Sequence, residues 1–304
     1  MLDDHVDILR LEKITKTFHI KPVFGSAKTV EALRNVNLSL KPGKALALVG
    51  ESGSGKSTVG RMIVQHYEAT SGRILFEGSD IADIADRASQ MRYRQAVQMV
   101  FQDPFSSLNP AHTIRHHLQR ALRLHQPDHA GEADVCRILD EVELDPNTTP
   151  DKYPHELSGG QRQRVNFARA LAVNARLIVA DEPTSMLDVS IRKSVLALMQ
   201  RLKAERGLSI LYITHDIATA EYLAEDTAVM FRGQVVEQGP TSDVVGAPKH
   251  SYTQLLRAAV PDPRQRLLAG DSGFSSHAKD VREASAHLVT GMIEQAPGHF
   301  TAQQ

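Results

Sequence analysis

The sequence holds only one cysteine, Cys136, among its 304 residues. A single cysteine excludes an internal disulfide, and its amphipathic surroundings at 133–142 favour a small core residue over a reactive thiol. Long apolar runs are also lacking, since no stretch approaches the roughly 20 apolar residues that a membrane-spanning helix requires. The acidic start at 1–13 lacks the basic-then-apolar order of a secretory signal. Any membrane contact is therefore expected to go through partner proteins.

An excess of either charge sign is absent as well. The chain has 35 Lys and Arg residues against 36 Asp and Glu residues, a formal net charge of -1. Proteins that bind nucleic acid through its phosphate backbone usually show a basic excess or stripe, so this balance disfavours a nucleic-acid partner. With 41% apolar and 23% charged residues, the composition is typical of a folded globular protein.

The first part of the chain reads as strands. Short strand patterns fill 8–49, and the run Ala45–Val49 is continuously apolar, as in a strand that is buried on both faces. From about 103 to 157 the pattern changes to helices with polar loops, which we interpret as a helical insertion. Five histidines in this insertion lack acidic or cysteine ligands at a recognisable spacing, so we expect surface histidines rather than a metal site. They are His112, His116, His117, His125 and His129.

Strand patterns return at 177–180 and 208–213, separated by a predicted helix at 191–206. Strands that flank helices at this spacing predict an α/β fold with a mainly parallel sheet. The last residues, 263–304, carry weak apolar patterning and predict a tail with a short helix.

A glycine-rich loop follows the strand predicted at Ala45–Val49. Its glycines let successive backbone N–H groups turn toward phosphate oxygens, and the next helix adds the positive end of its dipole. Lys56 would reach the β- and γ-phosphates of ATP, and Ser57 would offer its hydroxyl to Mg²⁺. The alternative is a turn with a solvated lysine, but the position between a buried strand and a helix favours the phosphate loop. The predicted nucleotide-binding residues are Gly50, Glu51, Ser52, Gly53, Ser54, Gly55, Lys56, Ser57 and Thr58.

An acidic pair ends the apolar strand predicted at 177–180. Asp181 would place a carboxylate beside the phosphates, where it can hold Mg²⁺ through water. Glu182, one residue further, is the candidate to orient or deprotonate the attacking water. A solvated acidic pair at a strand end is common, so this interpretation depends on the phosphate loop upstream.

A second glycine-containing segment, Leu157-Ser158-Gly159-Gly160-Gln161, directly precedes a helix-forming run. A serine and glycines at a helix N-terminus make another anion-binding site. One nucleotide does not need two such sites from one subunit, whereas two chains arranged head to tail would use both. We therefore expect a dimer in which each chain offers Ser158, Gly159, Gly160 and Gln161 to the nucleotide held by the other.

With these motifs the sequence resembles the ABC ATPase family over roughly residues 8–262. The resemblance implies a P-loop NTPase fold of the ABC type: a mainly parallel sheet core with an antiparallel β subdomain, a helical insertion and a C-terminal extension. It places the nucleotide-binding domain at 8–240 and the helical subdomain at about 103–165. The extension is expected at 241–262 and the tail at 263–304.

The resemblance also implies roles for residues outside the two glycine-containing segments. Gln102 resembles the Q-loop glutamine, which senses the γ-phosphate and water and is expected at Mg²⁺ with Ser57 and Asp181. His215 resembles the switch histidine that contacts the γ-phosphate, and Lys56 and Glu182 complete the implied catalytic set.

Two further roles follow from the same resemblance. The segment Ser185–Asp188 resembles the D-loop, in which Asp188 communicates across the dimer, although Met186 stands where alanine is usual. Phe18 could stack on adenine, while the alternative is a core phenylalanine at a strand end.

Two stretches resemble the oligopeptide and dipeptide import branch of the family. They are Phe101–Pro110, which in that branch meets the membrane subunits, and Pro248–Leu256, where Ser251 replaces the usual proline. Many members of the branch end in a cysteine-rich segment for an iron–sulfur cluster, but 263–304 contains no cysteine. The implied partners are a second ATPase of the same or a related sequence, two transmembrane permease subunits and an extracytoplasmic solute-binding protein. The implied location is the cytoplasmic face of the inner membrane, as a peripheral subunit.

Two other functions stay open on the sequence alone. The first is a soluble ABC-type ATPase that acts on nucleic acid or ribosomes, but such relatives carry long coiled coils, zinc modules or two nucleotide domains, and this chain shows none of these patterns. The second is a regulatory subunit that does not hydrolyse ATP, which would require a damaged motif. Every expected catalytic position is intact.

Overall fold

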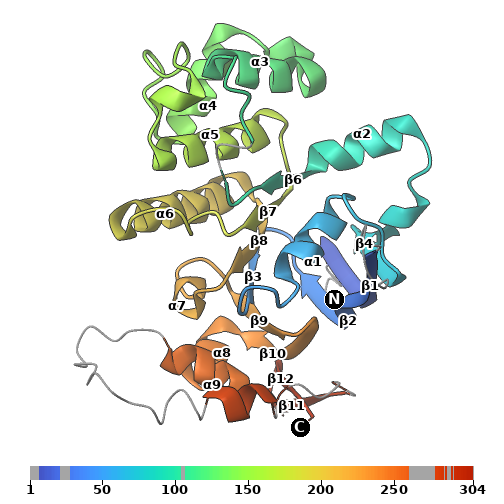
Figure 1. Cartoon of the computed structure of the whole chain (residues 1–304). Helices are drawn as coiled ribbons and strands as arrows, with labels where there is room; N and C mark the ends of the chain where they lie inside the picture. The colour runs from blue at the N-terminus through green and yellow to red at the C-terminus, as the bar shows by residue number, and fades with distance from the viewer. Residues whose placement is uncertain are drawn as a thin grey trace, which may run out of the picture. The chain divides into compact units, whose positions relative to one another are not determined.

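The computed structural model describes residues 7–20, 28–103, 107–259, 278–283, 285, 289 and 291–303. Residues 104–106 of the import-type stretch and 260–277 of the extension and tail lie outside this part. Figure 1 shows the whole chain. The chain divides into two compact units. The first unit comprises 1–41, 45–82 and 212–304, and the second comprises 42–44 and 83–211.

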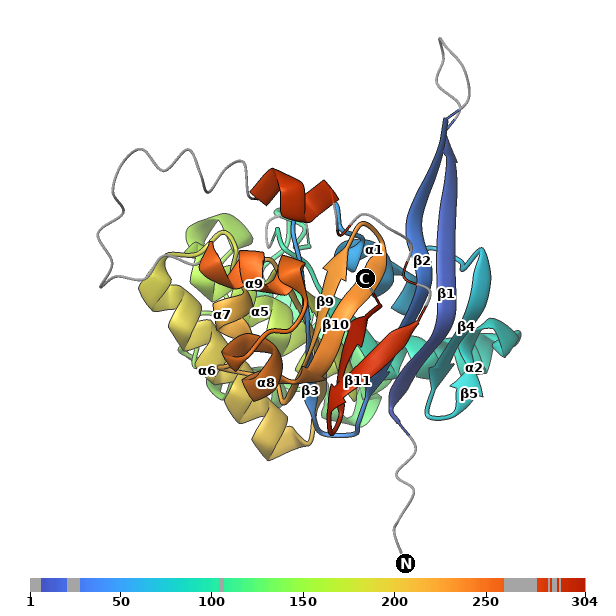
Figure 2. The same cartoon turned by 90° about the horizontal axis from the view of Figure 1, so that it is seen from below.

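An antiparallel sheet of four strands in the order β2-β1-β4-β5 lies in the first unit. Its long β1–β2 pair, seen in Figure 2, runs from the register Leu9↔Leu40 to Ile20↔Lys28. Alternation buries Leu9 and Leu11 on one face, as expected for a half-buried strand. The strands are β1 (Leu9–Ile20), β2 (Lys28–Leu40), β4 (Ser71–Phe76) and β5 (Ser79–Asp80).

The second strand is longer than its sequence pattern indicates. The pattern suggests separate pieces around 29–33 and 36–40, but the chain forms one strand in which Asn35 has a positive φ of 50°. The β1–β2 register shifts at Ile14↔Val36 and again at Lys16↔Leu33, which marks an irregularity of the bulge type. A bulge interrupts the alternation without ending the strand, which explains the difference.

The first unit also holds strands that surround the phosphate loop. All five residues of β3 are buried, as the continuous apolar run predicts, and β3 pairs in parallel with β9. On the other side of β9, β10 pairs antiparallel. These strands are β3 (Ala45–Val49), β9 (Asp226–Phe231) and β10 (Gln234–Pro240). The chain returns to this unit within β8 (Ser209–Thr214), which begins in the second unit.

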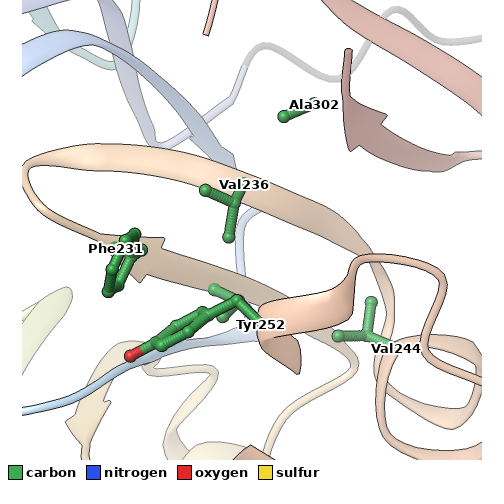
Figure 3. Close-up of a cluster of buried hydrophobic side chains, with 6 residues drawn as sticks. Phe231, Val236, Val244, Tyr252 and Ala302 are labelled. Carbon is green, nitrogen blue, oxygen red and sulfur yellow. The ribbon is translucent and has the colours of Figure 1, made fainter. Parts of the chain in front are cut away.

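Four α-helices and a helical stretch at 278–283 belong to the described part of the first unit. A buried cluster of Val229, Phe231, Val236, Val244, Tyr252 and Ala302 joins β9, β10, α8, α9 and the end of the chain (Figure 3). Burial of this apolar surface provides the main driving force that holds the C-terminal elements together. The helices are α1 (Lys56–Ile63), α7 (Ile217–Ala220), α8 (Thr241–Gly246) and α9 (Ser251–Ala258).

The end of the chain corrects the prediction of a tail with only a short helix. A helical stretch does occupy 278–283, but it is followed by a hairpin of β11 (Met292–Ala296) and β12 (His299–Ala302). The strand β12 pairs antiparallel with β10, so the hairpin extends the sheet edge (Figure 2). The strand β11 is short and its three central residues, Ile293, Glu294 and Gln295, are all exposed, so it shows no alternation that the sequence could reveal.

The second unit carries the expected insertion of helices. Its strands β6 and β7 pair in parallel. The helices α3 and α4 both contact α5 (Figure 1). Most residues of α5 are buried. The elements are α2 (Arg87–Ala96), β6 (Val97–Val100), α3 (Ile114–His125), α4 (Glu132–Glu141), α5 (Gly159–Ala172), β7 (Leu177–Asp181) and α6 (Val189–Arg206).

These elements confirm the predicted α/β class with its antiparallel β subdomain and helical insertion. The predicted domain boundaries at 165, 240 and 262 stay predictions. In the described part of the chain, no helix is both long and apolar enough to cross a membrane.

Candidate functional site

The predicted phosphate loop connects β3 to α1 in the first unit. Its lysine is buried, with 4% of Lys56 exposed, although a lysine side chain normally seeks water. The Lys56 ammonium donates hydrogen bonds to the carbonyls of Gly50 at 2.7 Å and Glu51 at 2.9 Å. The loop therefore wraps around its own cation and holds it at the start of α1.

Glycine is required where the loop enters the helix. Gly55 is the N-cap of α1 and has φ 106°, a conformation that side chains rarely adopt. A Cβ atom there would lie 2.8 Å from the carbonyl oxygen of Ala32. The residue next to it, Ser54, buries a hydroxyl with no hydrogen-bond partner among the described residues. A buried unpaired hydroxyl beside helix N–H groups and a lysine fits an anionic ligand such as a phosphate.

Phe18 lies on β1 in the same unit and is half-buried, so it is not the core residue of the alternative interpretation. Its ring makes an edge contact with Tyr67, with 5.2 Å between centroids. The Lys16 ammonium lies 5.1 Å from the centre of the Phe18 ring. Part of the ring is therefore open to a flat partner.

His215 follows the last residue of β8 and is exposed. The backbone around it is held by local hydrogen bonds: the Asp216 N–H donates to Thr214 Oγ1 at 3.1 Å, and the Asp216 carboxylate caps α7. An exposed imidazole on a fixed turn can reach a ligand without a change of fold.

The acidic strand end lies in the second unit. Asp181, the last residue of β7, is buried, whereas Glu182 is half-buried. Glu182 has a positive φ of 45°, which is uncommon outside glycine, and its carbonyl accepts hydrogen bonds from the Ser185 N–H and hydroxyl. Such strained backbone is typical of functional sites.

The structure brings Gln102 and Glu182 together. The Gln102 amide donates to the Glu182 carboxylate at 3.3 Å, a long contact between two residues 80 positions apart. At this distance the two groups are in direct contact, so a water molecule cannot lie between them, but both can hydrogen-bond one water molecule that lies beside the contact. Of the predicted catalytic residues, Gln102 and Glu182 belong to the second unit, and Lys56 and His215 belong to the first.

The segment Ser158–Gln161 forms the start of α5 as predicted. The Gln161 N–H donates to Ser158 Oγ at 3.3 Å, and the Gln161 side chain accepts from the Ser158 N–H at 2.9 Å. This reciprocal pair is a capping box. Since the Ser158 oxygen accepts, its hydroxyl hydrogen can donate to an outside acceptor.

Gly160 has a packing role that the anion-site argument did not include. A Cβ atom at this position would lie 2.5 Å from Cγ2 of Ile191 in α6. Only glycine lets the start of α5 approach α6 this closely.

The predicted D-loop is an exposed surface in the second unit. Asp188 is the N-cap residue of α6 and is exposed. Beside it, the apolar side chains of Met186 and Val189 are 62% and 69% exposed. Neighbouring exposed apolar side chains of this size commonly mark a protein interface.

Two residues that the sequence analysis did not assign contact the phosphate loop. The Glu51 N–H donates to the Tyr252 hydroxyl at 3.1 Å, and Arg282 donates to the Glu51 carboxylate. Burial raises the pKa of Tyr252, so its hydroxyl stays protonated. The likeness of Pro248–Leu256 to the import branch marked the region of Tyr252, but no signal pointed to Arg282.

The histidines of the insertion form a local group in the second unit. The rings of His112 and His116 stack with 4.0 Å between centroids. Burial and neighbouring positive charges lower the pKa of His116 and His117 below the ordinary value. Among the described residues, no group of three or more His, Cys, Asp or Glu side chains is arranged to hold a metal.

Comparison with protein families and curated proteins gives consistent matches. The family model described as ABC transporter matches residues 33–185. A putative peptide import ATP-binding protein of Brucella ovis is 39% identical, and the match covers 90% of this chain and 92% of that protein. The oligopeptide transport ATP-binding protein AppF of Bacillus subtilis is 41% identical over 97% of this chain and 96% of its own length. The glutathione import ATP-binding protein GsiA of Salmonella typhi is 41% identical over 91% of this chain, which corresponds to 45% of GsiA.

Solved structures are similar to this chain over most of its length. cbiO1 from Clostridium perfringens, part of the ABC transporter complex cbiONQ, is 28% identical with a TM-score of 0.68, covering 79% of this chain and 91% of its own. The ATP-binding cassette MJ0796, in a dimeric post-hydrolysis state bound to ADP and Pi, is 30% identical with a TM-score of 0.66. That match covers 77% of this chain and 98% of the cassette.

Proposed function

Because this chain belongs to the ABC transporter family and is an ATP-binding, ATP-hydrolysing subunit, we propose that it energises the import of peptides or related small solutes. The proposed import role is supported by the relatives named for peptide, oligopeptide and glutathione import. The observation that carries ATP binding is the phosphate loop, which holds the buried Lys56 between the carbonyls of Gly50 and Glu51.

The phosphate loop binds the nucleotide in this proposal. The N–H groups of residues 50–58 and the start of α1 contact the phosphates, and Lys56 exchanges its loop carbonyls for phosphate oxygens. Phe18 provides a face on which adenine stacks.

Glu182 orients the attacking water and accepts its proton, and Gln102 forms a second hydrogen bond with that water. His215 contacts the γ-phosphate end of the nucleotide. Bound Mg²⁺ would neutralise charge on the phosphate oxygens. Ser57, Gln102 and Asp181 carry the oxygen ligands that suit it, with Asp181 acting through water.

Two ATPase chains, the same or related, work as a pair in this proposal. Each chain offers the Ser158 hydroxyl and the N–H groups of Gly159, Gly160 and Gln161 to the nucleotide bound by the other. Asp188 contacts the other chain. The exposed Met186 and Val189 support this pairing, as does the dimeric cassette with a TM-score of 0.66.

The transport machinery supplies the other partners. We place the chain on the cytoplasmic face of the inner membrane, as a peripheral subunit bound to two permease subunits that receive solute from an extracytoplasmic binding protein. The stretch 101–110 is assigned to the permease contact by its resemblance to the import branch. The observations on the described residues and the relatives named above do not favour the alternative of a nucleic-acid or ribosome partner.

Uptake of labelled oligopeptides by cells that lack the chromosomal copy tests the proposal. Restoring the wild-type chain should restore uptake, and restoring Glu182→Gln should not, because losing a general base slows turnover by about 100-fold or more. Equal uptake with both chains would refute a role in driving peptide import. Both chains should be present at equal levels at the membrane, which immunoblotting checks.

A further inference from the structure

Glu51 is the point at which the phosphate loop meets the C-terminal part of the first unit. Its carbonyl holds the Lys56 ammonium at 2.9 Å, its N–H donates to the Tyr252 hydroxyl at 3.1 Å, and its carboxylate pairs with Arg282. Three different groups of one residue are therefore fixed, and two of the three partners lie about 200 or more positions away in the sequence.

The Arg282 contact is a charge pair made through two N–H groups. Nε and Nη2 of Arg282 donate to the same Glu51 oxygen at 3.0 and 2.6 Å. The Arg282 and Glu51 side chains are 44% and 36% exposed, so this pair is too accessible to add much to folding stability. The Arg282–Glu51 pair can still affect the binding of a ligand with several negative charges. Without Arg282, the unpaired Glu51 carboxylate in the phosphate loop would repel phosphate.

The Tyr252 side chain is held more firmly than the exposed Arg282 side chain. The Tyr252 ring is fully buried and packs on Phe231 with 4.3 Å between centroids (Figure 3). Its backbone N–H donates to His250 Nδ1 at 3.1 Å, which caps the start of α9. The hydroxyl that meets Glu51 is therefore carried by a fixed side chain on a capped helix.

The end of the chain is tied to the same helix start. The Glu237 carboxylate on β10 accepts from the Lys249 and His250 N–H groups at 2.8 and 3.1 Å. It also pairs with His299 of β12 at 2.7 Å, and both side chains are almost completely buried. A continuous series of hydrogen bonds thus runs from β12 through Glu237 and α9 to the phosphate loop.

We propose that Arg282 and Tyr252 are positioning residues that hold Glu51, and through it the phosphate loop, in the form that binds ATP. Arg282 neutralises the Glu51 carboxylate, and Tyr252 fixes its backbone. This inference rests on the proposed use of the loop for ATP. It gives the C-terminal segment 278–303 a role in ATP affinity rather than in the chemical step.

Steady-state hydrolysis and binding of a fluorescent ATP analogue by the full-length chain test this role. Arg282→Ala should raise KM and the dissociation constant about two- to fivefold, as expected from the strength of exposed charge pairs, and leave kcat within about twofold. Lys279→Ala is the matched control, because Lys279 is a more exposed cation of the same stretch that pairs only at 3.9 Å with Glu283. It should bind ATP like wild type.

A double variant shows whether Arg282→Ala acts through the charge of Glu51 or through a change in the fold. In a Glu51→Gln background the repulsive carboxylate is gone, so adding Arg282→Ala should change the dissociation constant by less than about twofold. The loss caused by Arg282→Ala alone should also shrink at high salt, where exposed charges are screened. Tyr252→Phe keeps the ring but removes the acceptor, and should raise KM with kcat unchanged.

The outcomes distinguish the two proposals. A wild-type chain that fails to bind ATP would refute the use of the loop, and this inference with it. If wild type binds ATP but Arg282→Ala behaves like Lys279→Ala, the positioning role alone is refuted. An equal loss from Arg282→Ala in the wild-type and in the Glu51→Gln background would show an effect unrelated to the carboxylate, and would refute it too.

Discussion

Replacing Gly160 by alanine tests the packing of the segment that is expected to meet the second nucleotide. The added Cβ atom would lie 2.5 Å from Ile191 Cγ2, whereas carbon atoms in contact are normally about 3.5–4.0 Å apart. The start of α5 or the Ile191 side chain must therefore move by about 1 Å. Ile191 is branched at Cβ and has few rotamers to choose from, so the helix start is expected to move.

The loss of unfolding free energy caused by Gly160→Ala follows from two opposing terms. Overpacking a well-filled site costs about 1–3 kcal/mol, and the better helix propensity of alanine offsets up to about 1 kcal/mol of it. From the middle of the overpacking range, about 2 kcal/mol, the net loss of unfolding free energy is then about 1–2 kcal/mol, or about 2–3 °C in Tm for a chain of 304 residues. Because Ser158 caps the same helix end, ATP hydrolysis should fall by about tenfold as its hydroxyl is displaced.

Thermal unfolding and ATPase rates of five chains test this prediction: wild type, the three single variants and the double variant. Gly159→Ala is the control, because its Cβ would meet only the tip of Leu187 at 3.3 Å, and it should lose little stability. Ile191→Ala removes the clashing methyl group, so Gly160→Ala should cost nothing further in that background. A Gly160→Ala chain as stable as wild type, or one that Ile191→Ala does not rescue, would refute the packing argument.

Three other predictions concern the remaining features. Purified Glu182→Gln should double in mass on adding ATP, because it binds without hydrolysing; light scattering that shows a monomer with bound ATP would mean that a different ATPase supplies the other half. Phe18→Ala should weaken ATP binding about fivefold or more, and Phe18→Tyr should not, since base stacking on an aromatic ring is worth about 1–3 kcal/mol; equal binding by both in a fluorescence titration would remove Phe18 from the site. Burial lowers the pKa of His250, so the unfolded chain binds its proton more readily and stability should fall as pH drops below about 6.5. His250→Asn keeps a capping acceptor and should reduce this dependence in urea unfolding at several pH values, whereas an unchanged pH profile would contradict the assignment.

Local motifs account for most of the secondary structure and fold class that the sequence predicts correctly. The phosphate loop, the acidic end of β7 and the start of α5 each combine a few adjacent residues with a recognisable strand or helix pattern. The strand at 177–180 is recognisable because it is continuously apolar. The helix at 191–206 is recognisable because Val195, Leu198, Met199 and Leu202 recur at helical spacing and are buried. The fold class follows from the order of such elements.

Contacts between distant residues account for what the sequence does not reveal. Arg282 and Glu51 are 231 positions apart, and nothing in the local pattern of either residue indicates the other. The hairpin β11–β12 depends on its pairing with β10 and not on its own alternation. Gly160 is a similar case, because the need for glycine comes from Ile191 in the next helix and not from the anion-binding pattern around it.

The hairpin at the end of the chain also affects solubility. An uncovered β10 would present a row of unpaired N–H and C=O groups, a template on which another chain can add as a strand and begin aggregation. In the described structure β12 covers this edge, and the new outer strand β11 is short, carries Glu294 and ends next to Pro297, features that discourage further pairing. A chain cut before Met292 is therefore expected to self-associate through β10 during expression, even where its nucleotide-binding elements fold correctly.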